Sequence, residues 1–303
     1  MKLVITGGTG FIGRSLCQAL EQDGHELVVL TRMARSSTSP RLRFVVWQPG
    51  ASGPWEREVD GADGIINLAG ESVVARRWTK RQKQRIMDSR VGTTKALVEA
   101  IRRASQKPSV LISASAVGYY GPKRDEVLSE DAKPGADFLA WVCQQWEAAA
   151  QTATPLGVRV VCLRIGLVLA RDGGALARMV PPFQWFMGGS LGSGRQWVSW
   201  VHRDDLVSLI QWALQNPRAS GALNATAPNP VTMKEFAGAL GRVLHRPAFM
   251  PVPAFALRLM LGDMAEMLLT GQRVVPDVAL QLGFAFKHPR LPEALNACCA
   301  SST

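Results

Sequence analysis

Apolar residues in the first half of the chain form short unbroken runs, and these runs alternate with longer amphipathic stretches. Such runs are typical of strands buried on both faces, whereas the amphipathic stretches repeat with the period of a helix. The pattern predicts strands at 3–5, 26–31, 42–47, 64–69, 109–114 and 158–163, and helices at 11–22, 79–104 and 138–152. This alternation predicts an α/β fold with a doubly wound parallel sheet, covered by helices on both faces.

The pattern changes after residue 169. Glycine, proline and tryptophan interrupt residues 171–200, and regular periodicity returns with a helix expected at 204–214, which Asp204 or Asp205 could cap. A strand at 222–224 and a helix at 233–244 follow, and no linker-like stretch separates them from the rest. We therefore expect a sheet domain at 1–169 and a smaller C-terminal lobe at 170–303, with residues 201–226 returning to the sheet.

A glycine turn follows the first predicted strand and opens the first predicted helix, with glycines at 7, 10 and 13. In a dinucleotide site the first glycine makes a tight turn, the second admits the pyrophosphate, and the third allows close helix–strand packing. The phosphates then meet the unpaired N–H groups of the helix N-terminus. Because strand, turn, helix and second strand follow in the order of a βαβ unit, we predict a Rossmann-type dinucleotide site. The cofactor contacts expected here are Gly7, Thr9, Gly10, Phe11, Ile12 and Gly13.

The end of the second predicted strand indicates which dinucleotide binds. Proteins that select NAD place a carboxylate about 20 residues past the glycines, where it binds the ribose 2′-hydroxyl. This chain has Thr31 and Arg32 there, with Arg35 close behind. A guanidinium binds a 2′-phosphate in a fork, whereas a carboxylate repels it. We predict NADP rather than NAD; the alternative is an exposed loop arginine with no ligand.

The chain carries a net charge of +11. Its densest basic cluster contains one aromatic residue, Trp78, whereas nucleic-acid surfaces interleave several stacking aromatics with their cations. The cluster therefore indicates a basic helix face, with phosphate binding by part of it as an alternative, and no nucleic-acid partner is expected. Its members are Arg76, Arg77, Lys80, Arg81, Lys83 and Arg85.

The five cysteines form no CxxC pair, and the four histidines show no metal-ligand spacing, so no metal site is expected. Free cysteines suit a reducing compartment, which favours a cytoplasmic location. We expect no signal peptide, because Met1 and Lys2 lead directly into the first predicted strand. The longest apolar stretch, 254–269, contains Arg258, Asp263 and Glu266 and is too short and too charged to span a bilayer, so we expect no membrane partner.

The glycine turn and the Asn-Leu-Ala-Gly string at 67–70 resemble the extended short-chain dehydrogenase/reductases. Further stretches match the pattern of that family at 113–121, 163–167, 201–206 and 223–226. More narrowly, the chain is similar to an atypical epimerase-family branch, whose members are also labelled nucleoside-diphosphate-sugar epimerases or cell-division inhibitors. The stretches typical of that branch are 67–71, 146–150, 192–194 and 269–274. The resemblance covers nearly the whole chain.

The resemblance implies further cofactor contacts. The backbone after the fourth strand would pass beside the cofactor, Arg90 could reach it from its helix, and residues 166 and 167 would line the nicotinamide through backbone groups. The alternatives are a helix-surface cation at Arg90 and simply the end of a core strand at 166–167. The added contacts are Leu68, Ala69, Gly70, Arg90, Ser113, Gly166 and Leu167.

The acid/base pair of the family is missing. The family's chemistry uses a tyrosine and a lysine four residues later on one helix turn, where the cation lowers the pKa of the phenol. Tyr119 and Lys123 have this spacing, but Pro122 between them cannot continue a helix. In the helix expected to carry the pair, the aligned positions hold Phe138 and Val142, or Leu139 and Cys143. Ordinary dehydrogenase or epimerase chemistry is thereby placed in doubt.

Two residues remain as candidate catalytic groups. Ser115 would donate a hydrogen bond to a substrate carbonyl, and Tyr119 is the nearest replacement acid; the alternative for Ser115 is a strand-end serine that binds the backbone. The leading hypothesis is an NADP-dependent oxidoreductase that moves a hydride to or from a small carbonyl or alcohol, held under residues 171–200. Trp185, Trp197 and Trp200 could shape its pocket or pack in the core.

The second hypothesis is a catalytically idle NADP-binding sensor, acting through a protein partner and connected with cell division. A nucleotide-sugar epimerase that retains its cofactor is a variant of the leading hypothesis. Many relatives pair through the helices that correspond to 79–104 and 138–152, so the resemblance allows a homodimer. Neither the substrate nor the partner follows from the sequence.

Overall fold

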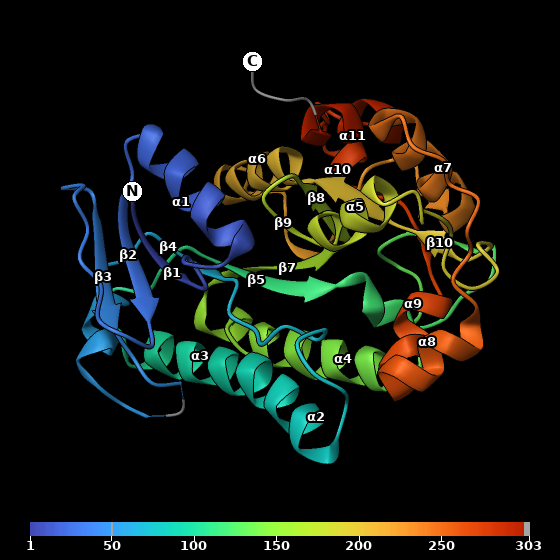
Figure 1. The fold of residues 1–303 in the computed structure, drawn as a ribbon. Coiled ribbons are helices and arrows are strands. Elements are labelled where there is room, and N and C mark those ends of the chain that lie inside the picture. Colours follow the sequence, from blue (N-terminus) through green and yellow to red (C-terminus); the bar gives the residue numbers. More distant parts are fainter. Residues whose placement is uncertain (50, 300–303) are drawn as a thin grey trace.

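A sheet of seven parallel strands forms the centre of the protein (Figure 1). The computed structural model describes residues 1–49 and 51–299. The strand order is β12-β7-β5-β4-β1-β2-β3, so the order reverses between β1 and β4, which is where ligands bind in doubly wound sheets. The strands are β1 (Lys2–Thr6), β2 (Glu26–Thr31), β3 (Leu42–Val46), β4 (Gly64–Asn67), β5 (Val110–Ala116), β7 (Arg159–Ile165) and β12 (Gly221–Ala225). The predicted fold class is confirmed.

Helices cover both faces of this sheet. In Figure 1, α1 (Phe11–Gln22) and α6 (Arg203–Gln215) lie above it, and α3 (Thr93–Arg103) and α4 (Phe138–Gln151) lie below it. Since successive side chains of a strand point to opposite faces, Leu3 and Ile5 join the core under α1 and α6. Val4 joins the second core, on the side of α3. Each near-continuous apolar run of the sequence therefore contributes side chains to the cores on both faces of the sheet.

The stretch predicted as one helix at 79–104 is divided. It consists of α2 (Lys80–Met87), a five-residue π-helical segment at Asp88–Gly92, and α3. Within it the Thr94 hydroxyl donates to the Arg90 carbonyl oxygen at 2.8 Å, so a side chain competes for the acceptor of the i→i−4 ladder. Such wide turns occur often at functional sites. This one places Arg90 beside the end of β4.

The C-terminal lobe surrounds a third core that contains Trp200 and Phe236. In its small sheets, β8 (Leu167–Ala170) pairs with β11 (Trp200–His202) on one side and with β9 (Gly173–Gly174) on the other, β10 (Trp197–Val198) pairs with β13 (Val231–Thr232), and β14 (Arg273–Val274) pairs with β6 (Val127–Leu128). Its helices are α5 (Leu176–Gln184), α7 (Met233–Leu244), α8 (Ala254–Leu261), α9 (Glu266–Leu269), α10 (Asp277–Gln281) and α11 (Leu291–Cys299). Short 3₁₀ turns lie at Pro54–Glu58, Val117–Tyr120, Thr154–Leu156 and Gly262–Ala265.

The junction between sheet and lobe differs from the prediction in one respect. Neither Asp204 nor Asp205 caps α6, because the cap is His202, whose Nδ1 accepts from the Asp204 amide at 3.2 Å. The buried Asp205 carboxylate instead accepts from the amides of Lys287 and His288, at 2.7 and 2.9 Å. It thus ties the segment before α11 to α6. In the described part of the chain, every helix is too short or too polar to span a bilayer.

Candidate functional site

The glycine turn has the geometry of a phosphate site. Gly7 has φ +71°, and a Cβ on it would lie 2.6 Å from the Leu68 carbonyl carbon. A Cβ on Gly13 would lie 2.2 Å from the Gly7 oxygen, so only glycine allows α1 to pack so closely. A Cβ on the exposed Gly10 would meet one non-adjacent atom, the Gly7 oxygen, at 3.1 Å. The outer side of Gly10 is therefore open, and no side chain caps the N-terminus of α1.

The neighbouring turn residues have different surroundings. The Phe11 ring packs against the backbone of Gly173 and Gly174 in the lobe, and the Arg203 guanidinium lies 5.4 Å from its centroid. Thr9 and Ile12 are half-buried at the start of α1. The sheet-side turn and the lobe thus meet at Phe11, beside the open face of Gly10.

The strand ends beside the turn are supported by a buried polar network. The Thr6 hydroxyl donates to Asn67 Oδ1 at 2.7 Å, and Asn67 Nδ2 donates to Thr94 Oγ1 at 2.8 Å and to Ser113 Oγ at 3.4 Å. The Ala69 amide donates to the Thr6 hydroxyl at 3.3 Å. Ser113 therefore lies behind the strand ends, where its hydrogen bonds are internal to the sheet.

Arg90 lies beneath the loop that leaves β4. It donates to the Glu71 carbonyl oxygen at 2.9 Å, and a Cβ on Gly70 would lie 3.2 Å from its Cζ. Its guanidinium lies 5.2 Å from the Trp146 ring centroid. Burial lowers the pKa of Arg90 below its usual range. The helix-surface alternative for Arg90 is wrong, because its side chain is largely enclosed and positions residues 70 and 71.

The end of β2 presents two free cations. The Thr31 hydroxyl donates to the Met33 carbonyl oxygen at 2.7 Å, which turns the chain out of the sheet. Arg32 and Arg35 follow on the exposed side. Within the described residues neither forms a hydrogen bond or an ion pair with the protein, and the strand that precedes them, β2, pairs with β1, which leads into the glycine turn. A phosphate is the kind of group these guanidinium groups could bind.

At 166–167 the backbone amides are already used. Gly166 donates to the Ala225 carbonyl oxygen at 3.1 Å and Leu167 to the Ser199 carbonyl oxygen at 2.8 Å. A Cβ on Gly166 would lie 2.5 Å from the Ser199 oxygen. Contact with a nicotinamide at this position would therefore come from carbonyl groups or from the Leu167 side chain, and not from the two N–H groups.

A second polar cluster occupies the same edge of the sheet. Ser115, Arg164 and Asn224 are in register on the neighbouring strands β5, β7 and β12, so their side chains point to one face, toward α4. Ser115 is 3% exposed, and its hydroxyl donates to Glu147 Oε1 at 2.6 Å. Glu147 lies on α4, and Arg164 donates to both of its carboxylate oxygens at 2.9 Å.

Arg164 organises this cluster. It donates to the Tyr120 hydroxyl at 3.0 Å and to the Glu130 carbonyl oxygen at 2.9 Å, and its guanidinium lies 3.5 Å from the Tyr119 ring centroid. Burial alone would lower the pKa of Arg164, but the hydrogen bonds and charge of Glu147 outweigh it and raise that pKa. Burial raises the pKa of Tyr120 to about 12. Tyr120 is therefore a structural phenol, and Tyr119 is the half-buried one.

The expected role of Ser115 needs correction. A hydroxyl carries one hydrogen, and a carboxylate only accepts hydrogen bonds. Ser115 therefore donates its one hydrogen to Glu147, and its lone pairs can accept a hydrogen bond from a ligand. It is not arranged to donate to a substrate carbonyl as predicted. The strand-end alternative is wrong too, because its partner is a side chain rather than the backbone.

Sequence reasoning missed Glu147 and Arg164 as site residues, although a signal existed. Arg164 interrupts the apolar strand 158–165, and a buried cation requires a buried partner. Glu147 is the one acid within the helix 138–151 that packs over this strand. Tyr119 and Lys123 do not share a helix, as predicted, because Tyr119 lies in a 3₁₀ turn that ends at Tyr120. Burial raises the pKa of the Cys143 thiol to about 11, as expected of a core cysteine.

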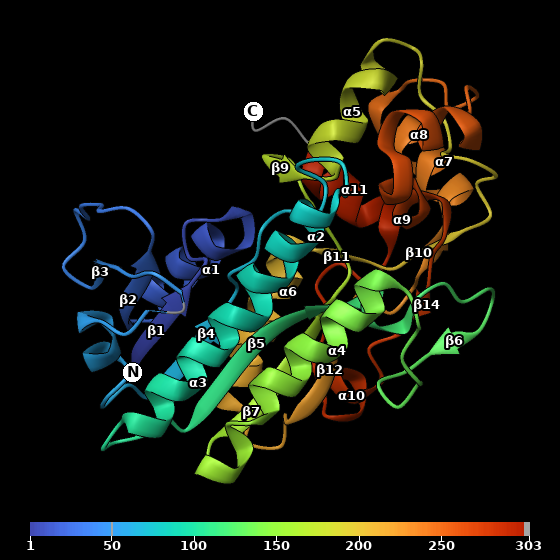
Figure 2. The same ribbon diagram turned by 90° about the horizontal axis from the view of Figure 1, so that it is seen from below.

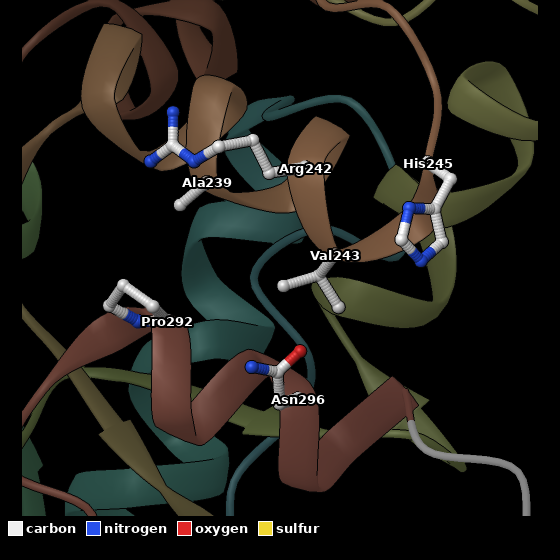
Figure 3. Close-up of a pocket in the computed structure, with 6 residues that line it drawn as sticks. All are labelled: Ala239, Arg242, Val243, His245, Pro292 and Asn296. Atoms are coloured by element: carbon white, nitrogen blue, oxygen red, sulfur yellow. The ribbon is translucent and has the colours of Figure 1, made fainter.

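The three tryptophans do not line one pocket. Trp200 is fully buried in the lobe core, Trp197 donates to Asp125 Oδ1 at 2.8 Å, and Trp185 is 74% exposed. Two hollows lie elsewhere in the lobe. One, of about 260 Å³, lies between α7 and α11, where Arg242, His245 and Asn296 face it (Figure 3). The other, of about 370 Å³, lies beside α5; neither hollow is lined by Ser115 or the glycine turn.

The histidines give a cluster that sequence spacing did not show. Donor atoms of His202, Asp204 and His288 lie within 4.8 Å of one another. His202 Nδ1 is already the cap acceptor for α6, and a cation there would face the positive end of that helix. We therefore interpret the group as a contact between α6 and the segment before α11.

A doubly wound sheet with a glycine turn at the point where the strand order reverses defines the class of dinucleotide-binding α/β proteins. Within that class, the chain belongs to the NAD dependent epimerase/dehydratase family, whose model matches residues 3–225. Residues 252–298 match a domain of unknown function, DUF1731. The family resemblance predicted from the sequence is thus confirmed.

The chain is similar to proteins of this branch over almost its full length. It is 46% identical over 301 residues to the chloroplastic epimerase family protein SDR39U1 homolog of Arabidopsis thaliana, covering 98% of this chain and 86% of the relative. It is 40% identical to epimerase family protein YfhF of Bacillus subtilis, covering 99% and 98%. A crystal structure of human epimerase family protein SDR39U1 (isoform2) with NADPH is 34% identical, with a TM-score of 0.88 over 98% and 99% of the two chains.

Proposed function

We propose that the protein is an NADP(H)-dependent oxidoreductase that moves a hydride between the nicotinamide and a small alcohol or carbonyl compound. The glycine turn would hold the pyrophosphate, since Gly10 leaves the space that a Cβ would fill. Arg32 and Arg35 would bind the 2′-phosphate, because both are free of protein partners in the described residues. A relative 34% identical in sequence was crystallised with NADPH, which supports the same choice here.

The observation that carries the proposal is the hydrogen-bonded Ser115–Glu147–Arg164 arrangement, which would serve as a proton path in place of the missing Tyr/Lys pair. Bound at the strand ends, the cofactor supplies a hydride acceptor or donor. A substrate hydroxyl would donate its hydrogen to Ser115 Oγ, and Ser115 would pass its own proton to Glu147. As the substrate carbon loses its hydride, the substrate oxygen loses its proton, and a carbonyl results.

Arg164 would hold Glu147 in place for this step, because it donates to both carboxylate oxygens. In the reverse direction the proton would return along the same path, or would come from Tyr119, whose ring lies on the Arg164 guanidinium.

The test is steady-state turnover of NADP⁺ with a panel of alcohols and of NADPH with the matching carbonyls. Variants Ser115→Ala and Glu147→Gln are expected to lower kcat at least a hundredfold, with the NADPH dissociation constant changed less than threefold, as for loss of a general base. Ser109→Ala is the matched control, since Ser109 lies just before β5 at the opposite edge of the sheet. Unchanged kcat in both site variants would remove this proton path.

One observation favours a second function. Within the described helix α4, neither a tyrosine nor a lysine faces the site, and the Ser115 proton is held by Glu147. A protein of this kind could bind NADP(H) and report it to a protein partner without catalysis. Tight NADPH binding, with no turnover of any panel compound and a co-purifying protein, would favour this sensor over the enzyme.

A further inference from the structure

One end of the lobe exposes an unusual number of large apolar side chains. They belong to the segment after α5, to the segment before α8 and to α8 itself, and their exposed fractions lie between 46% and 77%. We call this set the apolar rim. Its members are Trp185, Phe186, Met187, Phe249, Met250, Phe255, Leu259 and Met260. Single exposed apolar residues are ordinary, but a gathered set marks a surface that binds something.

A hydrogen bond joins two segments of the apolar rim, and the chain runs on directly into the third. The Met250 amide donates to the Gly188 carbonyl oxygen at 3.0 Å, so 185–188 and 249–250 run beside each other. The segment then enters α8, where Phe255 and Leu259 are one turn apart and so share a face. Figure 2 shows α5 and α8 at the end of the lobe opposite α10, and Figure 1 shows α5 above the level of the sheet and α8 below it.

One of these exposed side chains, that of Phe186, belongs to a residue with a strained backbone conformation. Phe186 has φ +60°, a left-handed conformation that a bulky residue rarely adopts. The Arg246 guanidinium lies 4.8 Å from the Phe186 ring centroid. Strain of this kind persists at sites where the conformation serves a function.

The charge beside the apolar rim is positive and uncompensated. Arg77 donates to the carbonyl oxygens of Leu259 and Met260 at 2.6 and 2.8 Å. Neither Arg77 nor Arg246 forms an ion pair with any described residue, whereas the nearby acids Asp263 and Glu266 are paired with Lys83 and Arg258. The net charge of the whole chain, +11, has the same sign.

We propose that the apolar rim docks on the surface of an anionic lipid bilayer. Aromatic and long apolar side chains enter the boundary between headgroups and acyl chains, while neighbouring arginines remain at the level of the headgroups. The negative surface potential of such a bilayer complements the unpaired cations. The proposal concerns attachment to a surface and is independent of the proposed reaction, which uses residues of the sheet edge.

The experiment is co-flotation of the full-length protein with phosphatidylcholine vesicles that contain phosphatidylglycerol, and with vesicles of phosphatidylcholine alone. The wild type is expected to float with the anionic vesicles at least tenfold more than with the neutral ones, and rising salt is expected to release it. The double variant Phe255→Glu/Leu259→Glu should lose at least tenfold in binding. Leu280→Glu is the matched control, because Leu280 is 44% exposed on α10.

Absence of flotation with anionic vesicles would overturn the proposal. So would equal binding by the double variant, because the apolar rim would then not be the contact. A third outcome, a dimer in solution that the double variant abolishes while no vesicle binds, would assign the apolar rim to a second copy of the chain. Circular dichroism of each variant shows that it is folded, since all three substituted side chains are exposed in the monomer.

Discussion

The ion pair beneath Ser115 is the most consequential contact of the site, and the variant Arg164→Met tests it. Arg164 and Glu147 have side chains only 5% and 12% exposed. Removing the arginine leaves a carboxylate with no cation in a largely buried position, which costs about 3–5 kcal/mol. It also takes a donor from the buried Glu130 carbonyl oxygen, worth a further ~1 kcal/mol.

A loss of about 4–6 kcal/mol is comparable to the whole stability of many proteins, about 5–15 kcal/mol. The double variant Arg164→Met/Glu147→Met removes both charges at once, and it is expected to recover most of the loss and lie within about 2 kcal/mol of wild type. Arg159→Met is the matched control, because Arg159 begins the same strand but donates only to the backbone carbonyl oxygens of 213, 214 and 219. We expect it to cost about 1–2 kcal/mol.

Urea unfolding followed by circular dichroism measures the free energy of unfolding of wild type, Arg164→Met, Glu147→Met and the double variant, which together close a double-mutant cycle, and of the Arg159→Met control. The reasoning requires a coupling of at least about 2 kcal/mol between the two Arg164 and Glu147 substitutions. It would be refuted if Arg164→Met cost no more than Arg159→Met, or if the two site substitutions were simply additive.

Further predictions concern the turn, the cofactor and acid stability. Gly13→Ala places a methyl 2.2 Å from the Gly7 oxygen, so we expect a loss of about 2–4 kcal/mol in urea unfolding and no measurable NADPH binding; normal binding would contradict the turn geometry. Arg32→Asp should abolish a preference for NADPH over NADH of at least tenfold, about 1.4 kcal/mol, in calorimetric titrations. The hydrogen bond from Arg43 lowers the pKa of Glu58, so this carboxylate stabilises the fold above its ordinary pKa and loses that contribution as pH falls through its lowered value. In the variant Glu58→Gln, the urea concentration at the unfolding midpoint should fall less between neutral and acid pH than in the wild type. An equally steep fall in the variant would refute this assignment.

The sheet could be predicted from the sequence because its signal is local. Buried parallel strands read as apolar runs, and the boundaries at 26–31 and 11–22 match the structure to the residue. The glycine turn was predictable for the same reason, since every requirement lies within seven consecutive residues. The division of 79–104 was not, because the π-helical segment depends on a hydroxyl of the following turn and on the loop that Arg90 supports.

The site beneath Ser115 was only half predictable. Its strand-end position follows from the pattern, but its proton arrangement depends on Glu147, which is 32 residues away and on another element. The cap of α6 shows the same limit. Asp204 and Asp205 are good cap residues by type, yet the backbone places His202 at the cap and turns Asp205 toward residues 287 and 288. The residue type limits which hydrogen bonds a side chain can form, and a partner distant in the sequence determines which of them it forms.

The bond from Asp205 to the segment before α11 also has a consequence for how the protein is made. Every strand of the large sheet has left the ribosome once residue 225 has emerged. At that moment Asp205, 1% exposed in the finished fold, has neither of its amide donors, because residues 287 and 288 are not yet synthesised. Burying an unpaired carboxylate is strongly unfavourable. The start of α6 is therefore expected to stay open to water until residues 287 and 288 have been made, so that a later-made segment completes the packing of an earlier-made helix.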